Sequence, residues 1–182
     1  MLMLMKTLLP VKINNGKSLE ERIEDQRDVG LIKFVNDNIV SGKFICVDTK
    51  NTHINCYTFG EPMSHSMVCE WLKENKPNMG LGTIFHLLAW HEMFPNRAIE
   101  NETILAPGTL WYKDPTWYFN KVIEYMPAVV YIGGRVGLDI RPIKDTTRDC
   151  ERDKVYPEGT GWIVCNRKMA EKNGRNRLQK RG

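Results

Sequence analysis

AVVYIGGRVGLDI, residues 128–140, is the clearest structural pattern in the sequence. Two runs of strand-forming residues, 128–132 and 136–140, stand on either side of Gly133-Gly134. A Gly-Gly pair in this position is typical of a two-residue turn, because glycine readily adopts the positive φ angles that such a turn requires. The stretch therefore predicts a β-hairpin.

Stretches outside this hairpin also predict strands. The apolar run within Lys43–Thr49 and the run Ile54–Phe59 are separated by polar turn residues, which predicts a second hairpin. Further strands are predicted at Thr103–Ala106, Thr109–Lys113 and Thr160–Cys165, and the charged stretch Lys144–Glu158 predicts a loop.

Four regions predict helices. Ser18 and Glu21 form a capping box, which predicts one helix, or two short ones, from Leu19 to about Asn36. Residues 81–94 are apolar almost all round, so they predict the central buried helix. The other two are predicted after Pro62, ending at Asn75–Pro77, and after Asp114, with Pro115 in the first turn.

The order of these elements predicts the fold class. The strands come as hairpins, without the strand–helix–strand crossovers that parallel sheets require. The prediction is an α+β fold, in which about four helices pack on one face of an antiparallel sheet. Residues 1–166 are expected to form a single globular domain, and residues 167–182 a basic C-terminal tail.

The charge is distributed unevenly along the chain. Residues 166–182 carry seven Lys/Arg and one Glu, whereas the other 165 residues carry 19 Lys/Arg and 21 Asp/Glu. The net charge of +4 therefore belongs to the tail, and the body of the protein is close to neutral. Basic segments of this kind favour polyanionic partners.

Cysteine usage and hydropathy give expectations about location. The five cysteines are odd in number and lack the spacing of a disulfide framework, which favours a reducing, intracellular compartment. A membrane span needs about 20 apolar residues, and no window of the sequence supplies them. We therefore expect a cytoplasmic protein, and we expect the apolar N-terminal segment, interrupted at Lys6 and Pro10, to be an edge strand or a staple on the core.

Histidine and cysteine residues in the first half of the chain suggest one kind of metal site. His53, Cys56, His65 and Cys69 supply four possible ligands for a tetrahedral zinc ion. The alternative is that they are ordinary structural residues, because a fold with this much apolar burial needs no structural metal. We favour this alternative and expect no cofactor.

A second possible metal site follows the apolar run Phe44–Val47. Asp48-Thr49-Lys50 resembles the metal-binding half of the PD-(D/E)xK nuclease motif. The resemblance covers three residues and implies a carboxylate, Asp48, that holds a divalent ion beside Lys50, with Asp37 as the nearby earlier acidic residue. The alternative is that Asp48 and Lys50 are turn residues at the mouth of a hairpin.

His86, His91 and Glu92 lie on the predicted central helix, but they do not form a metalloprotease motif. That motif needs two histidines four residues apart, on one helical face, and these two are five apart. We expect one of them to be buried and hydrogen-bonded and the other to face solvent.

Aromatic residues are concentrated between Leu110 and Phe119. Trp111, Tyr112 and Trp117 are candidates for a partner-binding surface, and Lys113 among them could approach a phosphate while the rings stack on bases. The alternative is that these rings fill the core.

The basic tail provides the remaining candidates for nucleic-acid binding. Its cations could neutralise several phosphates and give a salt-dependent affinity, or they could simply be a solvated terminus. They are Arg167, Lys168, Lys172, Arg175, Arg177, Lys180 and Arg181.

The leading hypothesis is a small non-enzymatic accessory protein that binds a nucleic acid or a nucleic-acid-processing complex. Its size and composition would suit an inhibitor encoded by a phage or a mobile element. One alternative is a metal-dependent nuclease that uses Asp48 and Lys50. Another is a protein–protein interaction module that uses residues 110–119.

Overall fold

The computed structural model describes residues 9–11, 17–41, 44–46, 52–113, 123–147 and 150–166. Within these ranges the chain forms five helices and a ten-stranded sheet, with two small two-stranded sheets beside it. The helices are α1 (Leu19–Asp28), α2 (Asp37–Ser41), α3 (His65–Asn75), α4 (Ile84–Met93) and α5 (Arg97–Asn101).

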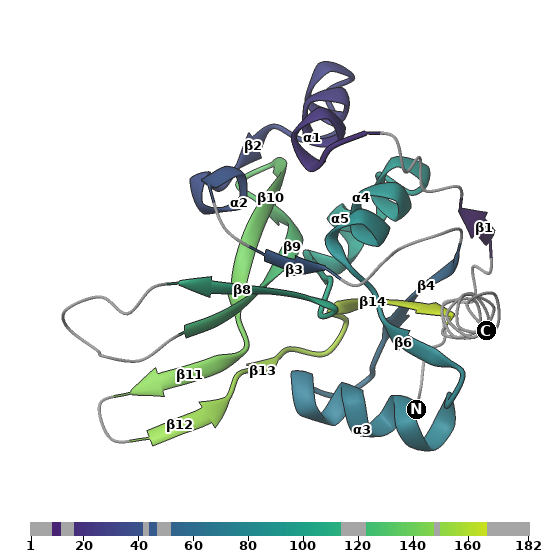
Figure 1. The fold of residues 1–182 in the computed structure, drawn as a ribbon, viewed down its shortest axis with the longest axis vertical. Helices are drawn as coiled ribbons and strands as arrows, with labels where there is room; N and C mark the ends of the chain where they lie inside the picture. Colours follow the sequence, from purple (N-terminus) through teal and green to yellow (C-terminus); the bar gives the residue numbers. More distant parts are fainter. Residues whose placement is uncertain are drawn as a thin grey trace, which may run out of the picture.

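The strands follow a path through the large sheet that mixes distant parts of the sequence. The order is β1-β4-β14-β7-β9-β10-β2, with β3, β6 and β8 attached to this path (Figure 1). Their bounds are β1 (Leu9–Val11), β2 (Phe34–Val35), β3 (Phe44–Cys46), β4 (Thr52–Thr58), β6 (Met79–Leu81), β7 (Thr103–Leu105), β8 (Thr109–Lys113), β9 (Ile123–Ile132), β10 (Arg135–Pro142) and β14 (Gly161–Asn166).

The prediction of an antiparallel sheet is wrong. In the described part of the large sheet, two strand pairs are parallel: β10 with β2, and β14 with β7. In both pairs a long connection carries the chain back to run alongside an earlier strand. Since these partners are far apart in sequence, local turn patterns do not reveal them.

The prediction that the helices cover one face is also wrong. Core residues of α1, α4 and α5 pack on one face of the sheet, and those of α3 pack on the other (Figure 1). Consecutive sheet residues alternate between the two cores, as the pleat of a strand requires. Ile163 of β14, for example, belongs to the α4 side and Trp162 to the α3 side.

The hairpin predicted at residues 128–140 is confirmed. β9 and β10 pair antiparallel, with Ile132 opposite Arg135. Gly133 and Gly134 have φ angles of 58° and 79°, the left-handed conformation that a two-residue turn of this type needs.

The second predicted hairpin does not form. β3 pairs with β8, whereas β4 lies between β1 and β14. The stretch predicted as a loop also differs, because it contains the hairpin of β11 (Lys144–Thr147) and β12 (Cys150–Asp153). It contains β13 (Val155–Tyr156) as well, which pairs with β5 (Met63–Ser64).

The predicted helix starts agree better with the structure. Ser18 and Glu21 form the expected capping box at α1, and the helix ends before Gly30, whose φ angle is 76°. It does not continue to Asn36, since β2 follows. α4 is the central helix as predicted, with Leu87, Leu88 and Trp90 almost fully buried.

Candidate functional site

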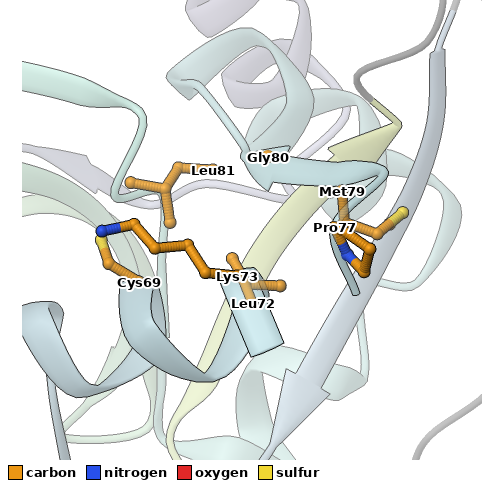
Figure 2. Close-up of a pocket in the computed structure, with 7 residues that line it drawn as sticks. All are labelled: Cys69, Leu72, Lys73, Pro77, Met79, Gly80 and Leu81. Atoms are coloured by element: carbon orange, nitrogen blue, oxygen red, sulfur yellow. The ribbon is translucent and has the colours of Figure 1, made fainter. Parts of the chain in front are cut away.

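α3 and β6 together enclose a small surface pocket on the α3 side of the sheet (Figure 2). Its volume is about 90 Å³. The helix supplies Cys69, Lys73 and the apolar Leu72, and the strand supplies apolar side chains and a glycine. The lining residues are Cys69, Leu72, Lys73, Pro77, Met79, Gly80 and Leu81.

The sequence of α3 determines how the helix faces this pocket. Ser64 is its N-cap, and the serine hydroxyl accepts a hydrogen bond from the backbone N–H of Met67 at 3.3 Å. Val68 and Leu72 are four residues apart and buried, so they fix one face of the helix to the core. The neighbouring face, which carries Cys69 and Lys73, is left at the pocket.

His65, Cys69 and Lys73 form a row on α3 because they are spaced four residues apart. The sulfur of Cys69 lies 3.9 Å from Nδ1 of His65. Cys69 and His65 are half-buried, whereas Lys73 is exposed. The row thus runs from a partly buried imidazole, past a thiol, to an ammonium group in solvent.

Burial lowers the pKa of His65, so its imidazole is neutral at neutral pH. The Pro107 carbonyl and the carboxylates of Asp153 and Glu124 oppose this effect in part. The Nε2 atom of His65 is buried and has no hydrogen-bond partner among the described residues.

Asp153 connects the start of α3 to the small sheets. Its carboxylate accepts hydrogen bonds from the hydroxyls of Ser66 and Ser64, the latter at 3.4 Å, and the two hydroxyls lie 3.0 Å apart. β5, which leads into α3, is paired with β13. The start of α3 is therefore held by side-chain contacts of Ser64 and Ser66 and by the pairing of β5 with β13.

The pocket also lies beside the point where the basic segment begins. Asn166, the last residue of β14, is paired with Met79 of β6, and Met79 lines the pocket. Residues 167–182 follow this strand in the sequence. On α3, Lys73 stands between Glu70 and Glu74 in sequence, whereas residues 167–182 carry seven Lys/Arg and one Glu.

The four residues predicted as possible zinc ligands do not come together. Only His65 and Cys69 are in contact among them. Cys56 is buried in the core on the α4 side of the sheet, and burial raises the pKa of its thiol to about 12. Across the part of the chain that the structure describes, no three His, Cys, Asp or Glu side chains are grouped as a metal site requires.

Most other predicted site residues lie outside the described part of the chain. This holds for Asp48, Lys50, Trp117 and the seven cations of residues 167–182. For Trp111, Tyr112 and Lys113 the structure describes the backbone alone. It places them in β8, where Trp111 is paired with Phe44 on one side and Tyr125 on the other.

The expectation that one of the α4 histidines faces solvent is wrong, because both are buried. Nδ1 of His86 accepts the N–H of Thr83 at 3.0 Å and contacts the Thr83 hydroxyl at 2.8 Å. Nε2 of His91 lies 3.4 Å from the carbonyl of Leu31. Their five-residue spacing brings them to different neighbours within one core.

Lys73 and the pocket were missed by the sequence reasoning. The usable pattern was the spacing of residues 65, 69 and 73 on a predicted helix, which places imidazole, thiol and amine on one face. The zinc hypothesis considered His65 and Cys69 together with an earlier pair, and it therefore overlooked the amine one turn further on.

Comparison with known proteins gives no relative: no protein-family model, no curated protein and no solved structure matches the chain. Among the described residues, no helix is both long enough and apolar enough to span a membrane.

Proposed function

We propose that this protein is a non-enzymatic accessory protein that binds nucleic acid through its basic segment, residues 167–182. The observation that carries the proposal is the separation of charge along the chain. Seven Lys/Arg and one Glu lie in residues 166–182, while the remainder has slightly more acidic than basic residues. Lys and Arg side chains bind the phosphate backbone and release its counterions, which gives affinity without a pocket.

The strand that precedes this segment in the chain supports the proposal. It follows β14, which is held by β4 on one side and by β7 and β6 on the other. Ile163 and Val164 of β14 are fully buried. The basic segment is therefore joined covalently to a buried strand of the folded domain.

The test compares two full-length variants that remove the same charge from different places. The first is Arg175→Gln, Arg177→Gln and Arg181→Gln within the basic segment. The second is Lys33→Gln, Lys76→Gln and Arg135→Gln, on the surface of the folded body. Both lower the net charge by three, so general electrostatic attraction would weaken equally in the two.

The measurement is fluorescence anisotropy of labelled single- and double-stranded DNA and RNA at several salt concentrations. We expect binding that weakens as salt rises, with the logarithm of affinity falling by about 0.9 per logarithm of salt for each duplex phosphate contacted. The segment variant should have a smaller slope and weaker binding, and the body variant should resemble the wild type. Equal losses in both variants, or no binding by the wild type at low salt, would contradict the proposal.

A further inference from the structure

Three cysteines with described side chains lie in three different environments. Cys56 is buried, and its pKa is raised by burial, so its thiol is inert at neutral pH. The Cys165 thiol is half-buried and donates a hydrogen bond to the carbonyl of Leu81, with 3.6 Å between sulfur and oxygen. Cys69 is half-buried at the pocket and faces the Nδ1 atom of His65. A carbonyl cannot take a proton from a thiol, but a neutral imidazole can.

The helix itself brings the groups of the row together. Side chains on an α-helix lean toward its N-terminus and over the residue four positions earlier. Cys69 accordingly leans toward His65, and Lys73 leans toward Cys69. Figure 2 shows the Lys73 and Cys69 side chains directed to the same side of the pocket, and both residues line it.

Each neighbour promotes a different part of thiol chemistry. The thiolate is the nucleophilic form of cysteine, and a nearby base or cation increases its population at neutral pH. His65 is kept neutral by its surroundings and so can accept the thiol proton. The ammonium group of Lys73 then stabilises the negative sulfur by charge attraction.

The pocket gives small molecules access to the sulfur from this side. Its volume of about 90 Å³ is well above the roughly 15 Å³ that one water molecule needs on the same measure. Hydrogen peroxide and other small hydroperoxides fit such a space. The apolar lining from Leu72, Met79 and Leu81 adds no competing nucleophile beyond the Met79 thioether.

We propose that Cys69 is a hydroperoxide-reactive thiol, activated by His65 and Lys73 at the pocket between α3 and β6. His65 takes the thiol proton, and the sulfur attacks one peroxide oxygen, forming an S–O bond as the O–O bond breaks. The departing hydroxide takes the proton from His65 and leaves as water. Sulfur is oxidised to the sulfenic acid, the peroxide is reduced, and the imidazole returns to its neutral form.

The first test uses the unmodified full-length protein with hydrogen peroxide as the oxidant. A sulfenic-acid trap such as dimedone marks each oxidised cysteine, and peptide mass spectrometry reports its rate. We expect Cys69 to be trapped roughly three- to tenfold faster than Cys165, the matched half-buried thiol, at pH 7. Alkylation by iodoacetamide across pH 5–10 should show the reactivity of Cys69 rising at lower pH than that of Cys165.

Variants then separate the roles of the two neighbours. His65→Leu should slow the oxidation of Cys69 at pH 7 by roughly three- to tenfold relative to the wild type. The two proteins should react at the same rate near pH 10, where hydroxide deprotonates the thiol. Lys73→Met should slow the oxidation as well, whereas Lys73→Arg keeps the cation and should stay close to the wild-type rate. A merely structural effect on α3 would slow labelling at every pH.

The proposal is overturned if Cys69 reacts no faster than Cys165 in the wild-type protein, a comparison that needs no variant to fold. It is also overturned if His65→Leu and Lys73→Met both leave the rate of Cys69 at pH 7 unchanged.

Discussion

The Nδ1 atom of His86 holds the first turn of α4. The backbone N–H of Thr83 can donate only to an unprotonated Nδ1, so the contact requires the neutral imidazole. The side chain is 2% exposed, and burial lowers the pKa of His86 to about 4. This places a titratable group inside the core, at the start of the central helix.

This arrangement predicts that acid destabilises the protein. The folded pKa lies below the ordinary value of about 6.5, so the unfolded chain binds the proton first as pH falls. His86 should therefore remove stability as pH drops from about 6.5 to about 4, by roughly 3 kcal/mol in total. Burial also lowers the pKa of His91, which adds to the same trend.

The check is urea unfolding of the wild type and of His86→Gln between pH 7 and pH 4. Glutamine at this third helical position can accept the Thr83 N–H as a capping-box residue does, without titrating. We expect similar stability of both proteins at pH 7 and a clearly shallower acid loss in the variant. Parallel curves for the two proteins would show that His86 does not contribute.

At the residue scale, the sequence predicted the types of the site residues better than their grouping. His65 and Cys69 were recognised as a possible pair because they lie four residues apart on one predicted helix. Their proposed partners His53 and Cys56 lie on β4, and strand alternation puts Cys56 in the core on the other side of the sheet. Grouping across elements depends on the pairing of strands, which a single sequence does not specify.

At the scale of elements, Gly82 lets the segment between β6 and α4 pass directly over β14. Its N–H donates to the carbonyl of Ile163 at 2.8 Å. A β-carbon at this position would lie 2.3 Å from a methyl carbon of Ile163 and 2.8 Å from its carbonyl oxygen. The backbone oxygen cannot move aside as a flexible side chain could.

Gly82→Ala should therefore cost more than Gly159→Ala, although the second glycine has a positive φ angle. Gly159 has a φ of 79° and nothing within 4 Å of an added β-carbon, so its substitution costs about 1–2 kcal/mol of backbone strain. Gly82→Ala adds crowding against backbone, which we expect to cost about 2–4 kcal/mol. Thermal and urea unfolding of the two variants provide the comparison, and equal losses would contradict the close approach at Gly82.

The hairpins show why some elements could be predicted and others could not. β9 and β10 are joined by two glycines, so the turn and both strands lie within one short stretch. β3 and β8 are paired although more than sixty residues separate Ile45 from Leu110. The sequence predicts both segments as strands. It does not predict that they pair with each other, because that pairing depends on non-local packing and no turn residue connects them.

At the scale of the whole molecule, one sheet separates two cores. α4 and its neighbours bury Leu87 on one face, and α3 buries Leu72 on the other. The predicted fold has helices on one face of the sheet only. That prediction did not apply the alternation of side chains along each strand to both faces of the sheet. The buried residues Trp162 and Ile163 of β14 are adjacent in sequence and serve opposite cores, a pattern expected of a strand covered on both faces.

Because both cores rest on the same strands, neither should unfold alone. Leu72→Ala leaves a cavity beneath α3 and should cost about 2–5 kcal/mol. If β14 and β9 couple the faces, this loss should lower the protection of amide hydrogens in α4 as much as in α3. Leu87→Ala, the matched change on the α4 side, should have the reciprocal effect on α3.

Hydrogen exchange with peptide mass spectrometry, at a series of sub-denaturing urea concentrations, measures both helices in one experiment. If the cores are coupled, the peptides covering residues 65–75 and 84–93 should converge on one opening free energy as urea rises. Each variant should then lower this free energy by the same amount in the two peptides. A fall in α3 protection alone in Leu72→Ala would mean that this helix opens as a separate unit. In that case, the pocket and Cys69 would be exposed by local opening of α3, and the reactivity of the thiol would rise with urea well before the sheet unfolds.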